Sequence, residues 1–312
     1  MSVVFRDAYQ SVKRGGGDAL ARSRGTLGRA KDKFVSFVKE IEEQTRPPAE
    51  ERQAYAPAVV EEDDPISFEI PKGITARAPN GMRIYAVGDI HGRADLLRRL
   101  MKLIEEDAAE APELRKVIVF VGDYVDRGFQ SRDVIEYLAS GVLDQYETHF
   151  LKGNHEQAFE MFLSDPTFGP EWARFGGSET LMSYGIQPPR SKTDKFGWEE
   201  VCAKLNQALP LEHRRFLNGL LMFKELGDYL FVHAGLRPGL SLAEQNERDF
   251  LWIREDFIND TGAFDRMIVH GHTPVTEPYR DYRRIGIDTG AYLTGKLTAA
   301  VLAADDVQFI ST

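Results

Sequence analysis

Two segments of the chain decide its fold: RIYAVGDIHG at residues 83–92 and VIVFVGDYVDRG at residues 117–128. Each segment starts as a short apolar run and changes abruptly to glycine and charged residues. Short apolar runs that end at such turn residues are typical of buried strands. Similar runs occupy residues 149–151, 229–232 and 267–269. The sequence therefore predicts five buried strands, each followed by a polar loop.

Stretches with helical periodicity lie between the predicted strands. Residues 94–110 repeat apolar side chains at three- and four-residue steps, and Ser131 is a candidate N-cap for a helix over residues 133–140. Residues 165–215 contain further helical stretches and the sequence FGG at residues 175–177, and we interpret them as a helical insert. Strands that alternate with helices predict an α/β architecture, in which ligands bind beyond the carboxyl ends of the strands.

The chain before the first predicted strand differs from the rest in charge. Residues 1–40 hold nine Lys/Arg and four Asp/Glu, a net charge of +5, whereas residues 41–64 hold two and eight, a net charge of −6. Together with clusters of Gly and Pro, these charge blocks predict that residues 1–80 form a charged, largely disordered extension. Apolar residues at helical spacing over residues 27–41 predict a short amphipathic helix within it, and residues 1–45 could dock a partner.

Composition limits the classes of function. A chain of 312 residues with 42% hydrophobic and 28% charged residues predicts one large or two modest globular domains. Its net charge of −10 argues against nucleic acid as a partner, because non-specific binding depends on neutralisation of phosphates by Lys and Arg. No run approaches the roughly 18 apolar residues of a membrane span, and the N-terminus lacks a long apolar h-region, so we expect a cytoplasmic protein without stable membrane insertion. Cys202, the one cysteine of the sequence, is expected to be a small buried hydrophobe rather than a nucleophile.

Histidines gather at the ends of the predicted strands. Of the seven in the sequence, five lie at or just beyond an apolar run: His91, His155, His233, His270 and His272. Near the strand ends also lie Asp89, Asp123, Asp126, Asn154 and Asp288. Carboxylate, amide and imidazole ligands together suit Mn, Fe or Zn better than Ca or Mg, because imidazole is favoured by the later metals. The sequence therefore predicts a metal site built from five segments that are far apart along the chain.

Taken in order, these five segments resemble the signature of the phosphoprotein phosphatases within the calcineurin-like metallophosphoesterases. The segments are GDIHG at 88–92, GDYVDRG at 122–128, GNHE at 153–156, FVHAG at 231–235 and HGHTP at 270–274. The segments LWIRE at 251–255 and IDTGA at 287–291 are similar to those of compact bacterial and phage members. The resemblance implies that residues 81–312 form the catalytic domain, an α/β sandwich of two mixed β-sheets flanked by helices.

The resemblance also assigns roles to individual residues. It implies two divalent metal ions, with manganese as the expected metal and iron or zinc as alternatives. One ion would be held by Asp89, His91 and Asp123, and the other by Asp123, Asn154, His233 and His272, so that Asp123 is the bridge. The phosphate would be bound by Arg127 and Arg254, and the general-acid pair would be His155 and Asp126. His270 has no ligand role in this mapping and is expected to support the ligands from behind.

These roles describe a hydrolytic mechanism. Two cations roughly 3.5–4 Å apart lower the pKa of a shared water, so a metal-bridging hydroxide can attack phosphorus in line. Planar guanidinium groups match the phosphoryl oxygens, and His155, oriented by Asp126, could protonate the leaving oxygen. The sequence thus predicts a metal-dependent phosphomonoesterase of the protein serine/threonine phosphatase kind, acting on a phosphoprotein or a small phosphorylated substrate.

Other functions stay open at this point. The main alternative is a hydrolase of diadenosine tetraphosphate or another nucleotide, whose members resemble this chain in the first and third segments. They usually replace the acidic residue that corresponds to Asp126, so its presence here favours phosphomonoesters. Broad phosphodiesterases commonly carry a further histidine two positions after the one that corresponds to His272, and this chain has Pro274 there. A non-catalytic binding module is disfavoured because every matched ligand and both arginines are present.

Overall fold

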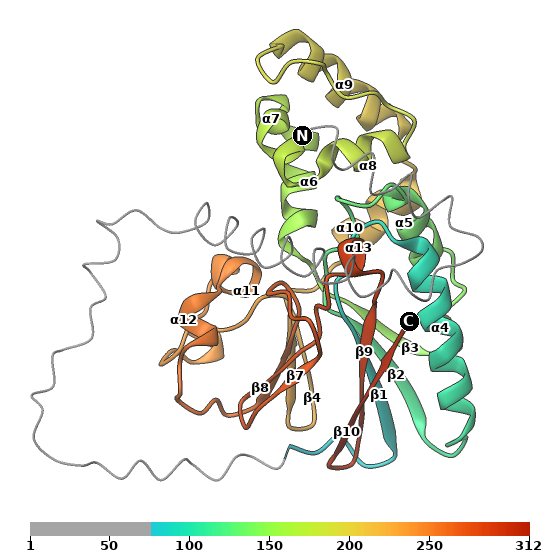
Figure 1. Ribbon diagram of the computed structural model, residues 1–312, viewed down its shortest axis with the longest axis vertical. Coiled ribbons are helices and arrows are strands. Elements are labelled where there is room, and N and C mark those ends of the chain that lie inside the picture. The colour runs from blue at the N-terminus through green and yellow to red at the C-terminus, as the bar shows by residue number, and fades with distance from the viewer. Residues whose placement is uncertain (1–75) are drawn as a thin grey trace, which may run out of the picture. The chain divides into compact units, whose positions relative to one another are not determined.

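Two mixed β-sheets of five strands each form the centre of the protein in a computed structural model that describes residues 76–312 (Figure 1). Residues 1–75 of the extension predicted for residues 1–80, including its amphipathic helix, lie outside the described residues. The order in the first sheet is β10 (Asp306–Ser311), β9 (Thr298–Ala303), β1 (Met82–Val87), β2 (Arg115–Phe120) and β3 (Glu147–Phe150). β1, β2 and β3 are parallel, β9 pairs antiparallel with β1, and β10 pairs antiparallel with β9.

The second sheet has a parallel centre and antiparallel edges. Its strand order is β4 (Phe223–Leu226), β5 (Tyr229–Val232), β6 (Met267–His270), β8 (Arg284–Gly286) and β7 (Tyr279–Arg280). β5, β6 and β8 run parallel, whereas β4 and β7 pair antiparallel with their neighbours. The predicted fold class, an α/β sandwich of two mixed β-sheets flanked by helices, is therefore confirmed.

The two sheets share a core made by alternate residues of their strands. Ile84 and Ala86 of β1 belong to the cluster that contains Phe231 of β5 and Val269 of β6, whereas Tyr85 belongs to the cluster on the other face of its sheet. This alternation follows from the two-residue period of a strand. Because the central strands are buried on both faces, they are continuous apolar runs in the sequence.

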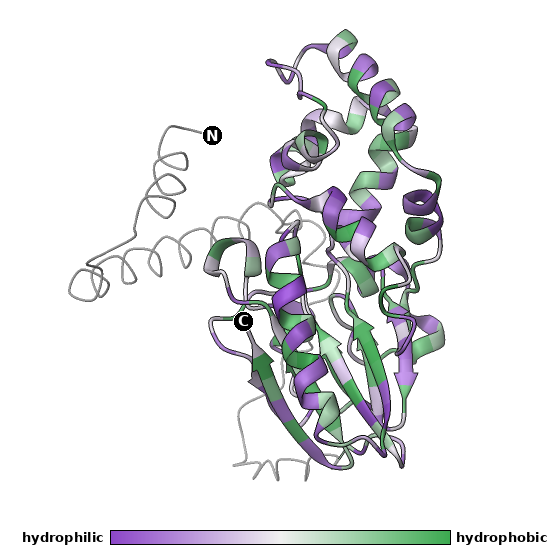
Figure 2. Ribbon diagram, turned by 90° about the vertical axis from the view of Figure 1, so that its right-hand side faces the viewer, coloured by the Kyte–Doolittle hydropathy of each residue, from purple (hydrophilic) through white to green (hydrophobic). Residues whose placement is uncertain are grey.

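Helices cover the outer face of each sheet (Figure 1). They are α4 (Ala94–Ala109) and α5 (Ser131–Ala139) on the first sheet, and α11 (Glu247–Trp252) and α12 (Glu255–Ile258) on the second. Leu97, Leu100 and Ile104 of α4 are fully buried, as the helical period of the sequence predicts. Phe250 and Phe257 fill the equivalent layer behind the second sheet. Figure 2 shows strands that are largely hydrophobic and helices that carry both kinds of residue.

A group of helices within residues 154–218, called here the helical lobe, projects beyond the first sheet (Figure 1). Its α-helices are α6 (Asn154–Ser164), α7 (Gly169–Trp172), α8 (Gly177–Ser183), α9 (Lys195–Ala208) and α10 (Leu211–Asn218). Trp172 stacks on Phe159 and Phe162, with ring centroids 5.4 Å and 4.7 Å away. Cys202 of α9 is buried as predicted, and its thiol donates to the Phe162 carbonyl at 3.2 Å.

Some elements differ from the sequence predictions. The five predicted strands correspond to β1, β2, β3, β5 and β6, and the other five strands are not predicted. Ser131 is the first residue of α5, and the N-cap is Gln130 rather than the predicted Ser131. The Ser131 hydroxyl accepts the backbone N–H of Asp126 at 3.1 Å. Within residues 76–312, no helix combines the length and the apolar content that crossing a membrane requires.

Candidate metal centre

The polar residues singled out in the sequence meet near the carboxyl ends of β1, β2, β3, β5 and β6. Eight of the ten predicted site residues are buried: Asp89, His91, Asp123, Asp126, Asn154, His155, His233 and His272. Arg127 and Arg254 are partly buried. Burying so many polar side chains is costly unless their charges and hydrogen-bonding atoms are paired. Their partners therefore indicate what this cluster is built to hold.

Asp123 lies at the centre of the cluster. Its Oδ2 is 3.4 Å from Nε2 of His91 and 3.9 Å from Nε2 of His155, and its Oδ1 is 3.5 Å from Nε2 of His233. Two sets of three residues present ligand atoms within 4.8 Å of one another, namely His91, Asp123 and His155, and Asp123, His233 and His272. Asp123 is common to both sets. The arrangement could therefore hold two metal ions that share one carboxylate.

The histidine tautomers fit a metal site. Nδ1 of His91 donates to the Val125 carbonyl and Nδ1 of His233 donates to the Val121 carbonyl, each at 2.9 Å. Burial lowers the pKa of both imidazoles, so each is neutral and its Nε2 carries a lone pair. The two Nε2 atoms lie 3.4 Å and 3.5 Å from the carboxylate oxygens of Asp123. Both kinds of atom accept hydrogen bonds, so a cation could bind between them, and Nε2 of His91 also accepts from Arg127 Nη1 at 3.0 Å.

Asn154 extends the second set of ligands. Its Oδ1 lies 2.9 Å from Nε2 of His233 and 2.9 Å from Nδ1 of His272. Nε2 of His272 is buried without a hydrogen-bond partner among the described residues. Burial, and then the charge of Arg254, lower the pKa of this imidazole. A buried ring nitrogen without a partner is rare, so the donor set fits a bound metal here as well.

Asp89 and Asp288 bring further negative charge to the centre. Asp89 accepts the backbone N–H of His272, with Oδ2 at 3.0 Å, but it does not belong to either three-residue set. Burial raises the pKa of Asp89, and repulsion from Asp288 and Asp123 adds to the rise. Burial also raises the pKa of Asp288. Three buried carboxylates in one place require positive charge, and Asp288 is a site residue to which the sequence assigned no role.

The two arginines supply part of that charge. Arg127 Nη1 lies 3.0 Å from Nε2 of His91, and its guanidinium carbon lies 4.9 Å from the ring centroid of Tyr292. Burial, followed by repulsion from Arg127, lowers the pKa of Arg254. Two cationic groups at one centre could bind an anion with several oxygens, such as a phosphoryl group.

His155 and Asp126 form a hydrogen-bonded pair beside the predicted metal ligands. Nδ1 of His155 donates to Oδ2 of Asp126 at 2.8 Å, and both side chains are buried. The same pairing leaves Nε2 of His155 facing Asp123. An imidazole held in this way can carry a proton to or from a bound substrate.

His270 lies outside both metal-binding sets. Its Nδ1 donates to the Gly271 carbonyl at 2.9 Å, and its Nε2 accepts from Arg284 Nη1 at 3.1 Å. Burial, with the charge of Arg284, lowers the pKa of His270 to about 3, so its imidazole is neutral. Its supporting role behind the ligands stays a prediction.

The loops of the site are built from strained backbone. Five residues with side chains adopt positive φ there: His91 (46°), Asp123 (52°), Asp126 (70°), Arg127 (65°) and His272 (62°). Left-handed backbone is unfavourable for residues other than glycine, and such strain concentrates at functional sites. The only other such residue among 76–312 is Ala304. The strain therefore marks the same place as the polar cluster.

Glu156 holds the most strained of these loops. Its Oε2 accepts the backbone N–H groups of Asp123 and Gly153, both at 2.9 Å, and its Oε1 accepts those of Tyr124 at 2.8 Å and Val125 at 3.2 Å. One fully buried carboxylate thus satisfies four backbone donors. The sequence placed Glu156 in the third segment without a role.

We expect Glu156→Gln to lower the free energy of unfolding by at least about 2 kcal/mol, because the amide NH₂ would leave two buried N–H groups without an acceptor. Urea denaturation of the two proteins measures this difference. Glu199→Gln, at an exposed position of α9, is the matched control and should change stability by less than about 0.5 kcal/mol. Equal stability of Glu156→Gln and the unmodified protein would contradict this role.

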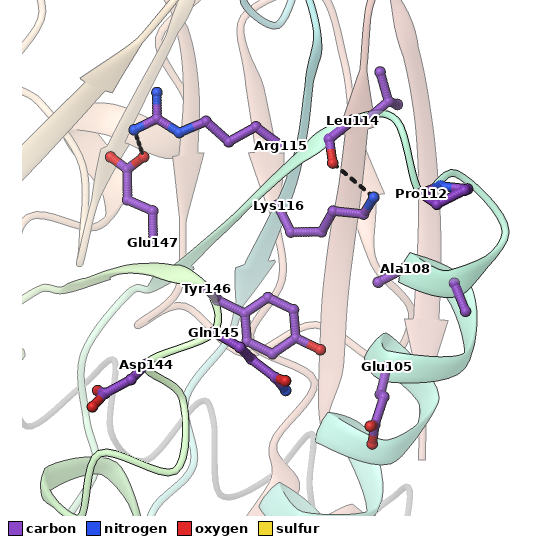
Figure 3. A pocket seen from close by; sticks show the side chains of 11 residues that line it. Glu105, Ala108, Pro112, Leu114, Arg115, Lys116, Asp144, Gln145, Tyr146 and Glu147 are labelled. Atoms are coloured by element: carbon purple, nitrogen blue, oxygen red, sulfur yellow. Dashed lines mark hydrogen bonds and ion pairs between the residues drawn. The ribbon is translucent and has the colours of Figure 1, made fainter.

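An open hollow of about 620 Å³ lies at the opposite edge of the first sheet (Figure 3). Arg115 and Glu147, at the amino-terminal ends of β2 and β3, form an ion pair across its rim, and Lys116 donates to the Leu114 carbonyl at 2.7 Å. None of the predicted site residues lines it. The predicted site residues lie near the carboxyl ends of the strands and not in this hollow.

Comparisons with known proteins agree with this geometry. Residues 82–309 match the family model of calcineurin-like phosphoesterases. A bis(5'-nucleosyl)-tetraphosphatase PrpE (asymmetrical) from Anoxybacillus flavithermus is 28% identical over 68% of this chain and 87% of its own length. The protein of that name from a Geobacillus species is 30% identical over 70% of this chain and 89% of its own length. A crystal structure provisionally described as that of a diadenosine tetraphosphatase matches with a TM-score of 0.50 at 20% sequence identity. The match covers 76% of this chain and 98% of that one, and at this identity it shows a likeness of fold alone.

Proposed function

The chain belongs to the calcineurin-like phosphoesterase family, and on this premise we propose that it is an asymmetrical dinucleoside tetraphosphatase. The reaction would split the tetraphosphate bridge into a nucleoside triphosphate and a nucleoside monophosphate. The main support for this substrate class is that the chain matches tetraphosphatases over 87–89% of their length. This substrate is the alternative of the sequence analysis, and it now has better support than a phosphoprotein.

The metal centre would use the residues that surround Asp123. We assign Asp89, His91 and Asp123 to one ion, and Asp123, Asn154, His233 and His272 to the other. Manganese is the metal we expect for this mixed donor set, with iron or zinc as alternatives. When bound, two divalent cations would supply Lewis acidity and a water of lowered pKa.

The arginines would hold the phosphoryl group under attack. Arg127 and Arg254 are both partly buried at the metal centre, where charge-assisted hydrogen bonds are strong. Arg127 would turn from His91 toward the substrate oxygens, with Tyr292 beneath its guanidinium plane. Stabilising charge on those oxygens as the bond to phosphorus breaks would lower the barrier.

The His155–Asp126 pair supports a second candidate function, the hydrolysis of phosphomonoesters, including phosphoproteins. An alkoxide leaving group needs a proton, and His155 with its ring fixed by Asp126 at 2.8 Å could donate it. A nucleoside triphosphate is a much better leaving group and gains little from protonation. The pair therefore favours phosphomonoesters, whereas the relatives favour the tetraphosphate.

Product analysis distinguishes the two functions. Purified full-length protein with added Mn²⁺ should convert diadenosine tetraphosphate into ATP and AMP with a kcat/KM at least about tenfold above that for a phosphoserine peptide, which corresponds to about 1.4 kcal/mol of transition-state binding. A preparation of Asp123→Asn made in parallel controls for contaminating hydrolases. Formation of ADP alone would contradict asymmetrical cleavage. A higher kcat/KM for the phosphopeptide would replace the first proposal with the second.

A further inference from the structure

The helical lobe reaches into the metal centre at Asp126. Trp172, the last residue of α7, donates its Nε1–H to Oδ2 of Asp126 at 2.9 Å. Thr180 of α8 donates its hydroxyl to Oδ1 of Asp126 at 2.7 Å and accepts the backbone N–H of the same residue at 2.9 Å. With His155 on Oδ2, both carboxylate oxygens are therefore occupied, and the two side-chain donors other than His155 come from α7 and α8.

We propose that Trp172 and Thr180 are positioning residues that aim the Asp126 carboxylate at His155. Asp126 has a positive φ of 70° in a loop, so its own backbone does not favour the conformation that the pair needs. The donors from α7 and α8 each bind one oxygen of this carboxylate. The inference rests on the acid role proposed for His155, which Trp172 and Thr180 would serve without touching the substrate.

The donor of Trp172 is itself rigidly placed. Its ring is fully buried and stacked on Phe159 and Phe162. A Cβ added at Gly177 would lie 2.2 Å from Cδ2 of Trp172, so only glycine permits this packing. Because aromatic packing fixes the ring, the indole N–H can be directed at one carboxylate oxygen with little loss of entropy.

A second contact ties the lobe to the phosphate-binding loop. The backbone N–H of Arg127 donates to the Gly176 carbonyl at 3.2 Å, and Gly176 has a φ of 107°. A Cβ at Gly176 would lie 2.5 Å from that nitrogen. The FGG sequence at residues 175–177 thus lets the lobe approach the loop that carries Asp126 and Arg127. This contact accounts for a motif that the proposed hydrolytic roles leave unexplained.

The positioning role predicts a loss that depends on the leaving group. Thr180→Val removes the hydroxyl at nearly constant volume, while Ser131 still accepts the Asp126 N–H at 3.1 Å. We expect turnover of phenyl phosphate to fall at least about tenfold, because a misplaced acid loses part of a contribution of roughly 10²–10⁴-fold. Hydrolysis of p-nitrophenyl phosphate, whose leaving group needs little protonation, should fall far less. Thr180→Ser keeps the hydroxyl and should restore phenyl phosphate turnover.

Two further measurements guard against a trivial result. Trp172→Phe keeps the aromatic stack and removes only the N–H, so it should repeat the selective loss. In the full-length protein loaded with Zn²⁺, the ring N–H resonance of His155, identified by its absence in His155→Gln, should shift in Thr180→Val and stay in place in Thr180→Ser. This readout does not depend on which substrate the enzyme prefers.

The outcomes separate this inference from the proposed function. Equal losses on both aryl phosphates in Thr180→Val, with an unshifted His155 resonance, would overturn the positioning role. If His155→Gln lowers the turnover of both aryl phosphates equally, His155 is not the general acid, and the positioning role inferred for Trp172 and Thr180 fails with it. If the unmodified, metal-loaded protein cleaves no phosphorylated substrate, the proposed function fails, whereas the resonance shift still tests the geometry.

Discussion

Asp123→Asn is expected to lower the hydrolysis of every phosphorylated substrate by more than about 100-fold, beyond the 10–100-fold typical of residues that only support metal ligands. The carboxylate of Asp123 belongs to both metal-binding sets, and asparagine keeps its size without its charge. Turnover of Mn²⁺-reconstituted protein, together with its metal content by mass spectrometry, measures the effect. We expect loss of bound metal and loss of turnover together.

Asp144→Asn is the control for this substitution. Asp144 is exposed and distant from the carboxyl ends of the strands, so the same change of charge there should leave metal content and turnover within about twofold. If Asp123→Asn retained both metals and full turnover, the chemistry would have to lie elsewhere in the chain.

His155→Ala should lower the turnover of phenyl phosphate by about 10²–10⁴-fold, the usual contribution of a general acid. The loss on p-nitrophenyl phosphate and on diadenosine tetraphosphate should be much smaller, because their leaving groups are stable without a proton. Steady-state kinetics across these three substrates measures the difference. The expected pattern places His155 at the leaving oxygen and leaves metal binding unchanged.

His149→Ala is the matched histidine control. His149 lies in β3, away from the metal centre, and its Nε2 pairs with Glu147 at 2.9 Å. Removing it should change turnover on all three substrates by less than about twofold. Identical losses on good and poor leaving groups in His155→Ala would point instead to a role in metal binding, for which its 3.9 Å distance from Asp123 leaves room.

The fold was predictable where a strand is buried on both faces. β1, β2, β5 and β6 are continuous apolar runs, and the polar residues after them marked the edge of the sheet that carries the site. β7 has two residues, β10 is an exposed edge strand, and β4 mixes charged with apolar residues. Such strands depend on pairing with a neighbour that the local sequence does not reveal.

The candidate site was predictable in its residue types and only partly in its contacts. The family resemblance implied that Asp123 would be shared, and Asp123 lies within 4 Å of three imidazoles. The sequence did not reveal that Glu156 binds four backbone N–H groups or that Trp172 and Thr180 hold Asp126. These contacts join loops and helices whose relative placement is set by packing, so no spacing rule could have found them.

The substrate is the point on which single residues and whole-chain similarity differ. Asp126 favours phosphomonoesters in the sequence analysis, and its pairing with His155 is consistent with that preference. The tetraphosphatase relatives, aligned over most of their length, favour the nucleotide. The product analysis tests the preference for the nucleotide, and the leaving-group comparison tests the acid role of His155 with Asp126.

By itself, the sequence determined the family and predicted a donor set for the candidate metal centre, because ligand types and their positions after buried strands are local properties. Only the tertiary structure decided which nitrogen of His91 and of His233 faces Asp123, since a backbone carbonyl of the segment that follows β2 accepts the opposite ring N–H. It also decided that the lobe orients Asp126, because hydrogen bonds across 46 and 54 residues exist only when packing brings the donors to the acceptor.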